Sequence, residues 1–283
     1  MPCGDASWGS GMSILIQQTL QAIFGQPYLL VERSDDLLQR AYRLEPQPEP
    51  EPLFTDTELA AHQDDGPLLL RLSPGSALFD AYSKAPGDWP GLLLSTIQPA
   101  STVLAHLRRL LIVGFGERRK ALLRYYDPRV ASYFFPACAA ESSTTWLGPI
   151  HQLNWHGGTW RDAAQGLSQW HQLTHPETRT TPPVPLQLSA RQSRAIEHQQ
   201  LERFTYEWQQ ARKGVSFDQA WDYLQQGLAC GFDEHDSLHA YLDLRIQYPA
   251  HDVHPIPPTG DAQERLQLLR AHLEAPAFKE QYT

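Results

Sequence analysis

Histidine is the residue type in this sequence that most calls for a test of metal chemistry. Four histidine pairs lie three to five residues apart: His151/His156, His171/His175, His235/His239 and His251/His254. A zinc hydrolase needs a third ligand and a general base beside such a pair, as in the HExxH motif. None of the pairs has Glu directly after its first His, and the acidic residues around His235 are interpreted as partners of a helix N-terminus. The sequence therefore predicts neither a bound metal nor a cofactor.

Residues that could act as nucleophiles lie outside the known catalytic patterns. There is no GxSxG elbow, and Cys138 lies in an apolar stretch that raises a thiol pKa rather than activating it. Gly114-Phe-Gly116 lacks the rest of a GxGxxG motif and is interpreted as a hairpin turn. The three cysteines have no CxxC spacing, which excludes a disulfide framework and a zinc knuckle. We expect a protein that is not an enzyme.

The segment Arg124-Tyr-Tyr-Asp-Pro-Arg129 carries more information than any other. Asp127 is a good helix N-cap, and Pro128 suits the first helical position because its missing N–H costs no hydrogen bond there. Arg124 would end a strand and Arg129 would lie in the first helical turn, so both could clamp carboxylates. We interpret the segment chiefly as a structural corner between a strand and a helix.

The elements that must position these residues follow from apolar periodicity. Up to residue 173, short apolar runs alternate with helical patterns. Strands are predicted at 28–31, 67–72 and 91–97, helices at 35–42, 77–82 and 101–107, and hairpins at 109–113 with 120–126 and at 146–155 with 159–161. This order predicts an α/β (α+β) lobe over residues 12–173, with a mixed β-sheet and flanking helices. Residues 1–11 are expected to be disordered or a remnant of expression, and the Pro-rich residues 174–188 a linker.

Residues 189–283 predict a second lobe, a small helical bundle. Its four helices are expected from 189 to Gly214, from a capping sequence at Ser216, from 233 to before Pro249, and from 261 to before Pro276. Four aromatic residues at helical spacing are candidates for a partner-binding groove, although any of them could equally be core: Trp208, Trp221, Tyr223 and Tyr241.

Charge and hydropathy exclude two classes of partner. The chain has 283 residues, 23 Lys plus Arg, 32 Asp plus Glu, and a net charge of −9. Affinity for a phosphate backbone comes from Lys and Arg, so an acidic chain is a poor nucleic-acid binder. No apolar run reaches the length of about 18 residues that a membrane span needs. We expect neither nucleic acid nor membrane among its partners.

The first lobe resembles a known family. His106–Val113 (HLRRLLIV), a glycine turn, Leu123–Val130 (LRYYDPRV) and Leu147–Ile150 (LGPI) are similar to the signature of domain of unknown function 4123, the effector adaptors of bacterial type VI secretion also called Tap or Tec proteins. The resemblance covers about residues 26–160. One departure is Glu32, where the family often carries Asp; a capping acid could have moved to Asp35. The motif residues are His106, Arg108, Arg124, Tyr125, Tyr126, Asp127, Pro128, Arg129, Gly148 and Pro149.

The resemblance implies a cytoplasmic, non-enzymatic chaperone. Such a protein holds a cognate toxic effector, often by its N-terminal region, and helps to load it on the VgrG spike. A scaffold shared by many adaptors does not choose among effectors, so specificity is expected from the helical lobe or from its cleft with the first lobe. The alternative is a hydrolase that uses His and Asp residues of both lobes in an interlobe cleft.

Overall fold

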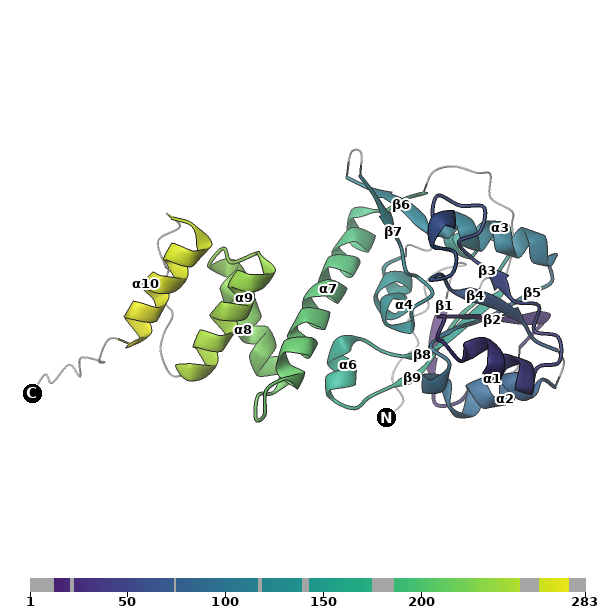
Figure 1. Ribbon diagram of the computed structural model, residues 1–283, viewed down its shortest axis with the longest axis horizontal. Helices are drawn as coiled ribbons and strands as arrows, with labels where there is room; N and C mark the ends of the chain where they lie inside the picture. The colour runs from purple at the N-terminus through teal and green to yellow at the C-terminus, as the bar shows by residue number, and fades with distance from the viewer. Residues whose placement is uncertain are drawn as a thin grey trace, which may run out of the picture. The chain divides into compact units, whose positions relative to one another are not determined.

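The computed structural model describes residues 13–20, 23–73, 75–116, 119–138, 143–174, 186–249 and 260–274. It divides into two compact units, residues 1–200 and residues 201–283, which are described separately (Figure 1). The predictions for residues 1–11 and for residues 175–185 of the linker lie outside the described part of the chain. No described helix is long and apolar enough to cross a membrane.

A seven-stranded sheet forms the centre of the first unit. Its order is β1-β9-β8-β5-β2-β4-β3, and every neighbouring pair is antiparallel. The three strands predicted at 28–31, 67–72 and 91–97 are confirmed as β2, β4 and β5. The strands are β1 (Ser13–Gln17), β2 (Gln26–Val31), β3 (Glu51–Pro52), β4 (Leu68–Arg71), β5 (Gly91–Thr96), β8 (Gln152–Gly157) and β9 (Gln169–Thr174).

Two layers of helices cover the two faces of this sheet, because strand side chains alternate between faces. Leu29 and Val31 of β2 pack with α1 and α2, whereas Leu30 packs with α3, α4 and the segment after α4. Figure 1 shows α1 and α2 together on one side of the strands. The helices are α1 (Leu37–Leu44), α2 (Ala77–Lys84), α3 (Ala100–Leu110), α4 (Pro128–Phe134), α5 (Ser143–Leu147), α6 (Trp160–Ala164) and the short 3-10 turns η1 (Ala60–His62), η2 (Pro86–Asp88) and η3 (Phe135–Ala137).

A second, three-stranded sheet contains the predicted hairpin. Strands β6 (Ile112–Phe115) and β7 (Arg119–Leu122) are antiparallel, and β10 (Leu186–Gln187) adds to β6 in parallel. Parallel and antiparallel pairing therefore occur together in this small sheet and not in the large one. The Gln187 side chain packs directly over Gly114, where a Cβ would lie 2.2 Å from Gln187 Nε2 and would make that side chain move. The predicted α/β class is confirmed.

The second predicted hairpin, 146–155 with 159–161, is wrong. Trp146 lies in α5, and β8 pairs with β9 on the far side of α6. The reason is a capping box: Thr159 Oγ1 accepts a hydrogen bond from the Asp162 N–H, and Asp162 Oδ2 accepts one from the Thr159 N–H. This box starts a helix where the sequence analysis expected a returning strand. His171, one of the paired histidines, consequently lies on β9.

The second unit is the predicted bundle. It contains the end of α7 (Ala190–Gln210) together with α8 (Phe217–Ala229), α9 (His235–Gln247) and α10 (Ala262–Glu274). The Ser216 side chain caps α8 by accepting from the Gln219 N–H, as the capping sequence predicts. The helix expected to end at Gly214 ends four residues earlier, at Gln210, and Gly214, with a positive φ of 81°, lies in the turn that follows. Leu269 and Leu273 of α10 are buried, as the helical spacing predicts.

The border between the two units lies after Gln200, whereas the sequence predicts that the second lobe begins at residue 189. Residues 186–187 form β10, and α7 begins within the first unit, which ends at Gln200. Two contacts explain this: Arg191 donates to the Pro136 carbonyl at 2.8 Å, and Gln192 Nε2 donates to Cys138 Sγ at 3.3 Å. The first turns of α7 are thereby tied to η3 and to Cys138, directly after it.

Candidate functional site

The Arg124–Arg129 segment forms a corner that leads into α4, as predicted, but Arg124 does not end a strand, because β7 (Arg119–Leu122) stops two residues before it. Asp127 Oδ1 accepts a hydrogen bond from the Arg129 N–H at 2.8 Å, and Pro128 occupies the first turn. The cap satisfies a backbone donor that a helix start otherwise leaves free. The N-cap role predicted for Asp127 is confirmed.

Arg124 binds the carboxylate of Glu32, a residue from the N-terminal part of the first unit. Its guanidinium forms an ion pair with Glu32, directly after β2, and lies 5.9 Å from the ring centre of Tyr126. Partial burial lowers the pKa of Arg124, but the hydrogen bond and charge of Glu32 outweigh this and raise it. The suggestion that the acid moved to Asp35 as a helix cap is wrong: the N-cap of α1 is Asp36, without a side-chain cap bond. Glu32 serves as the partner of Arg124 instead.

Arg129 binds backbone rather than a carboxylate, contrary to the expectation from sequence. Its Nη1 donates to the carbonyls of Gly158 at 3.1 Å and Thr159 at 3.0 Å, and its guanidinium lies 5.3 Å from the ring centre of Trp160. Arg129 therefore fixes the turn between β8 and α6. The Trp160 N–H donates to the Tyr133 hydroxyl at 2.7 Å, a second tie from α4 to the same turn.

The two tyrosines of the motif anchor the corner to α3. The Tyr125 hydroxyl is buried and donates to the Leu107 carbonyl at 2.9 Å. The Tyr126 ring meets the Tyr125 ring edge-on, with 5.8 Å between ring centres. Burial raises the pKa of Tyr126 to about 12. Neither hydroxyl is therefore poised to act as an acid or a base near neutral pH.

His106 is the buried histidine of the motif. Its Nε2 lies 3.1 Å from the Trp146 carbonyl, and its Nδ1 lies 3.2 Å from Arg109 Nη2. Because a guanidinium can only donate, Nδ1 accepts and the proton is on Nε2. Burial lowers the pKa of His106 to about 4. The imidazole is a neutral bridge between α3 and the end of α5.

The remaining motif residues also make internal ties. Arg108 donates to the Pro52 carbonyl at 3.1 Å and to Asp56 Oδ2 at 3.3 Å. The Pro149 carbonyl accepts from Thr96 Oγ1 at 2.6 Å, and Gly148 has a positive φ of 52°. The ten motif residues thus do not converge on one reaction centre. They connect α3, α4, the end of α5 and the loop after β2.

Three of the four residues predicted to line a partner groove are core instead. Trp208, Tyr223 and Tyr241 are buried in the hydrophobic cluster of the second unit, because helical spacing places them on the inward faces of α7, α8 and α9. Trp221 is half-buried and stacks on Phe217 with 6.3 Å between ring centres. Of the four, Trp221 alone keeps an accessible surface within the described structure.

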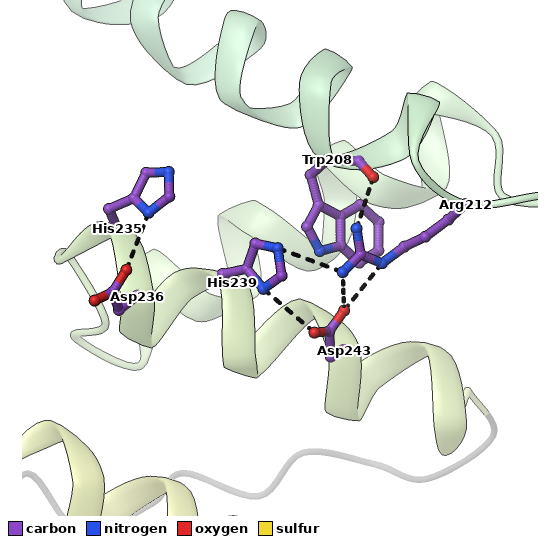
Figure 2. Close-up of polar contacts among 6 residues, drawn as sticks. All are labelled: Trp208, Arg212, His235, Asp236, His239 and Asp243. Carbon is purple, nitrogen blue, oxygen red and sulfur yellow. Dashed lines mark hydrogen bonds and ion pairs between the residues drawn. The ribbon is translucent and has the colours of Figure 1, made fainter.

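A polar cluster that the sequence analysis missed ties the end of α7 and the turn after it to α9. Figure 2 shows Arg212 against the Trp208 ring, facing Asp243 and His239. Arg212 Nε donates to Asp243 Oδ1 at 3.0 Å, its Nη1 donates to the Trp208 carbonyl at 2.8 Å, and its guanidinium lies 4.2 Å from the Trp208 ring centre. The spacing of His239 and Asp243, four residues apart on one helix, was the signal available in the sequence.

The histidine pair His235/His239 belongs to this region but does not form a metal centre. His239 Nδ1 lies 3.3 Å from Asp243 Oδ2, whereas His235 contacts the adjacent Asp236 at 3.2 Å (Figure 2). Within the described residues, no group of three or more His, Cys, Asp or Glu side chains is arranged to hold a metal ion. The cluster is a structural ion pair extended by a histidine.

Part of the first unit matches a known family model. Residues 27–145 match the family model described as domain of unknown function (DUF4123). The matched range holds β2 to β7, α1 to α4 and the Arg124–Arg129 corner, and it ends just before Gly148 and Pro149. The resemblance expected from the sequence is confirmed over this range. Comparison with curated proteins and with solved structures gives no significant match.

Proposed function

We propose that this protein is a non-enzymatic cytoplasmic adaptor that binds a cognate type VI secretion effector and helps to load it on the VgrG spike. The observation that carries the proposal is the DUF4123 domain over residues 27–145, with the motif of the type VI adaptors at Arg124–Arg129. The effector is expected to be held by its N-terminal region.

The use of the motif side chains supports a scaffold rather than a reaction centre. His106 is buried and neutral, Arg129 is bound to carbonyls, and Tyr125 donates to the main chain. A catalytic acid or base must reach a substrate and needs a pKa near the working pH. These groups instead hold helices and turns in place, as expected of a scaffold that positions a binding surface.

The first unit also exposes apolar side chains of the kind that protein interfaces use. Phe24 and Ile97 are 63% and 64% exposed, and the backbone of Gly25, directly after Phe24, lies close to Ile97, since a Cβ built there would be 3.4 Å from Ile97 Cγ2. The Phe24 ring meets the His151 ring edge-on at 5.5 Å. Clustered exposed aromatic and aliphatic side chains are typical of binding surfaces. We propose this patch, Phe24 with Ile97 and His151, as one contact for the effector.

We propose that the second unit determines which effector the protein binds. Trp221 on α8 is the residue of the original four that can still touch a partner. An apolar helix of the effector could pack beside it through side chains at i, i+3, i+4 and i+7. The proposal for the second unit therefore now rests on Trp221 and not on Trp208, Tyr223 or Tyr241.

The test is co-purification of the full chain with the effector encoded by the neighbouring gene. A stable complex is expected, and Ile97→Lys or Trp221→Ala should weaken it at least tenfold, with folding checked by circular dichroism. Leu167→Lys is the matched control, because Leu167 is also exposed, at 55%, on a different loop. A wild-type chain that captures no effector would contradict the adaptor role.

The alternative function, a hydrolase, is tested by a separate experiment. It requires histidine and aspartate from both units, whereas the described contacts His235–Asp236 and His239–Asp243 each lie on α9. Stoichiometric zinc in protein purified without a histidine tag, together with hydrolysis that is lost in His239→Ala, would favour the enzyme. We do not propose it.

A further inference from the structure

Strand β1 (Ser13–Gln17) forms one edge of the large sheet. It pairs with β9 alone, from Ser13 opposite Thr174 to Gln17 opposite Trp170. An edge strand presents a row of unpaired N–H and C=O groups that can template pairing with another chain. Its side chains Leu15 and Ile16 are 42% and 61% exposed. The outer side of β1 is therefore both apolar and, among the described strands, unpaired.

The other edges of the described sheets carry protective features that β1 lacks. Strand β3 at the opposite edge is two residues long and consists of Glu51 and Pro52. Strand β7 carries Arg119 and Lys120, and β10 has two residues. Charged residues, proline and short length are the devices by which proteins prevent edge pairing. Strand β1, with the sequence Ser-Ile-Leu-Ile-Gln, has five residues, no charge and no proline.

The sequence of β1 is complementary to itself in antiparallel pairing. If two copies pair about a twofold axis at Leu15, Ile14 lies opposite Ile16 and Ser13 lies opposite Gln17. Apolar residues then face apolar residues and polar residues face polar ones, as an isologous interface requires. Every pair in the large sheet is already antiparallel, so this addition continues its pattern.

The same arrangement covers the exposed side chains. Ile14 is half-buried and packs on the core cluster that α3 and α4 cover, and Ile16 points to the same face because strand side chains alternate. In the paired form, the exposed Ile16 of one copy lies beside the half-buried Ile14 of the other. The two Leu15 side chains meet on the opposite face. Pairing thus removes both exposed apolar residues of β1 from water.

We propose that β1 is a homodimerisation edge, at which two copies of this chain join their sheets by antiparallel pairing centred on Leu15. The proposal concerns association of the chain with itself and does not depend on the effector. We choose a second copy of the chain as the occupant because β1, when it pairs antiparallel with itself, places apolar residues opposite apolar residues and polar residues opposite polar ones.

The first test measures the mass of the full chain, without effector, by sedimentation velocity over a concentration series. We expect a shift from monomer to twice the monomer mass as the concentration rises. Ile16→Lys should abolish the shift, because it places a charge at the edge. Leu268→Lys is the matched control, since Leu268 is exposed to a similar degree, 54% against 61%, and lies on α10 of the second unit. A chain that is monomeric throughout, or equal effects of both variants, would overturn the proposal.

The second test reads the register by oxidative cross-linking. Opposite Cα atoms in antiparallel strands are about 4.5–5.5 Å apart, within the range of a disulfide. Leu15→Cys should therefore give a cross-linked dimer beyond the wild-type background, which includes the native cysteines. Ser13→Cys should not, because the two copies of that residue would be about 14 Å apart along the strands. Cross-linking by Ser13→Cys instead of Leu15→Cys would refute this register.

An effector segment is the competing occupant of the same edge. If Ile16→Lys abolishes effector capture while the wild-type chain stays monomeric at every concentration, β1 binds the effector and the second-copy proposal is wrong. If the chain dimerises through β1 but captures no effector, the adaptor function fails while this inference stands.

Discussion

The imidazole of His106 lies directly against the backbone of Gly148. A Cβ at Gly148 would be 2.5 Å from His106 Cε1, and the φ of Gly148 is +52°. The contact joins α3 to the turn after α5, 42 residues further along the chain. A side chain at position 148 and a buried imidazole at position 106 therefore exclude each other.

Gly148→Ala should destabilise the first unit by about 2–5 kcal/mol, through left-handed backbone strain and the clash with His106. Gly166→Ala is the control, because Gly166 has a φ of +70° but nothing within 4 Å of the added Cβ. It should lose about 1–2 kcal/mol from the backbone alone. Urea unfolding measures both. Equal losses would show that the His106 contact contributes nothing.

Asp127→Ala should lower the free energy of unfolding by about 0.5–2 kcal/mol, because the Arg129 N–H loses its 2.8 Å acceptor. Asp127→Ser retains a capping oxygen and should recover most of the loss. Thermal unfolding by circular dichroism reports the difference. If melting is unchanged in Asp127→Ala and effector capture is lost, the corner is a recognition site rather than a structural one.

Protonation of His106 should make stability depend on pH. Burial lowers the folded-state pKa from 6.5 to about 4, so the unfolded chain takes up the proton first. The stabilisation is complete above about pH 6.5 and is lost as the pH falls towards 4, by about 3 kcal/mol in full. The pKa values of His156 and His171 are also lowered by burial and add to the slope.

The difference between wild type and His106→Gln isolates the contribution of His106. The free energy of unfolding of the variant should fall less steeply between pH 6.5 and 4 than that of the wild type. His62→Gln is the control for the substitution itself, because His62 is exposed. Parallel curves for wild type and His106→Gln would contradict the assignment.

Arg212→Ala should destabilise the second unit by about 1–2 kcal/mol, since it removes the partner of Asp243 and the cation over Trp208. Arg203→Ala is the matched control on α7, the helix that precedes Arg212, where an exposed pair with Glu207 contributes less than about 0.5 kcal/mol. Tryptophan fluorescence during urea unfolding follows the change near Trp208. An equal effect of the two variants would show that the cluster in Figure 2 is a surface pair of no special value.

Local chemistry made much of the fold predictable. Asp127-Pro128 starts α4 and Ser216 starts α8, because a cap is satisfied within three residues. The hairpin of β6 and β7 follows from a glycine-containing turn between apolar runs. The failure at α6 was also local: Thr159 and Asp162 form a capping box that the sequence analysis overlooked.

The sequence by itself determined the α/β class, the helical second unit and the starts of α4 and α8, since those depend on hydrogen bonds and periodicities that span a few residues. Tertiary structure alone decided that Glu32 pairs with Arg124, 92 residues away, and that β1 pairs with β9. It also decided that Trp208, Tyr223 and Tyr241 are buried in the core while Trp221 packs half-buried against its edge. The physical reason is that an amphipathic pattern marks which face of a helix is apolar, whereas only the packing of the whole chain determines what covers that face.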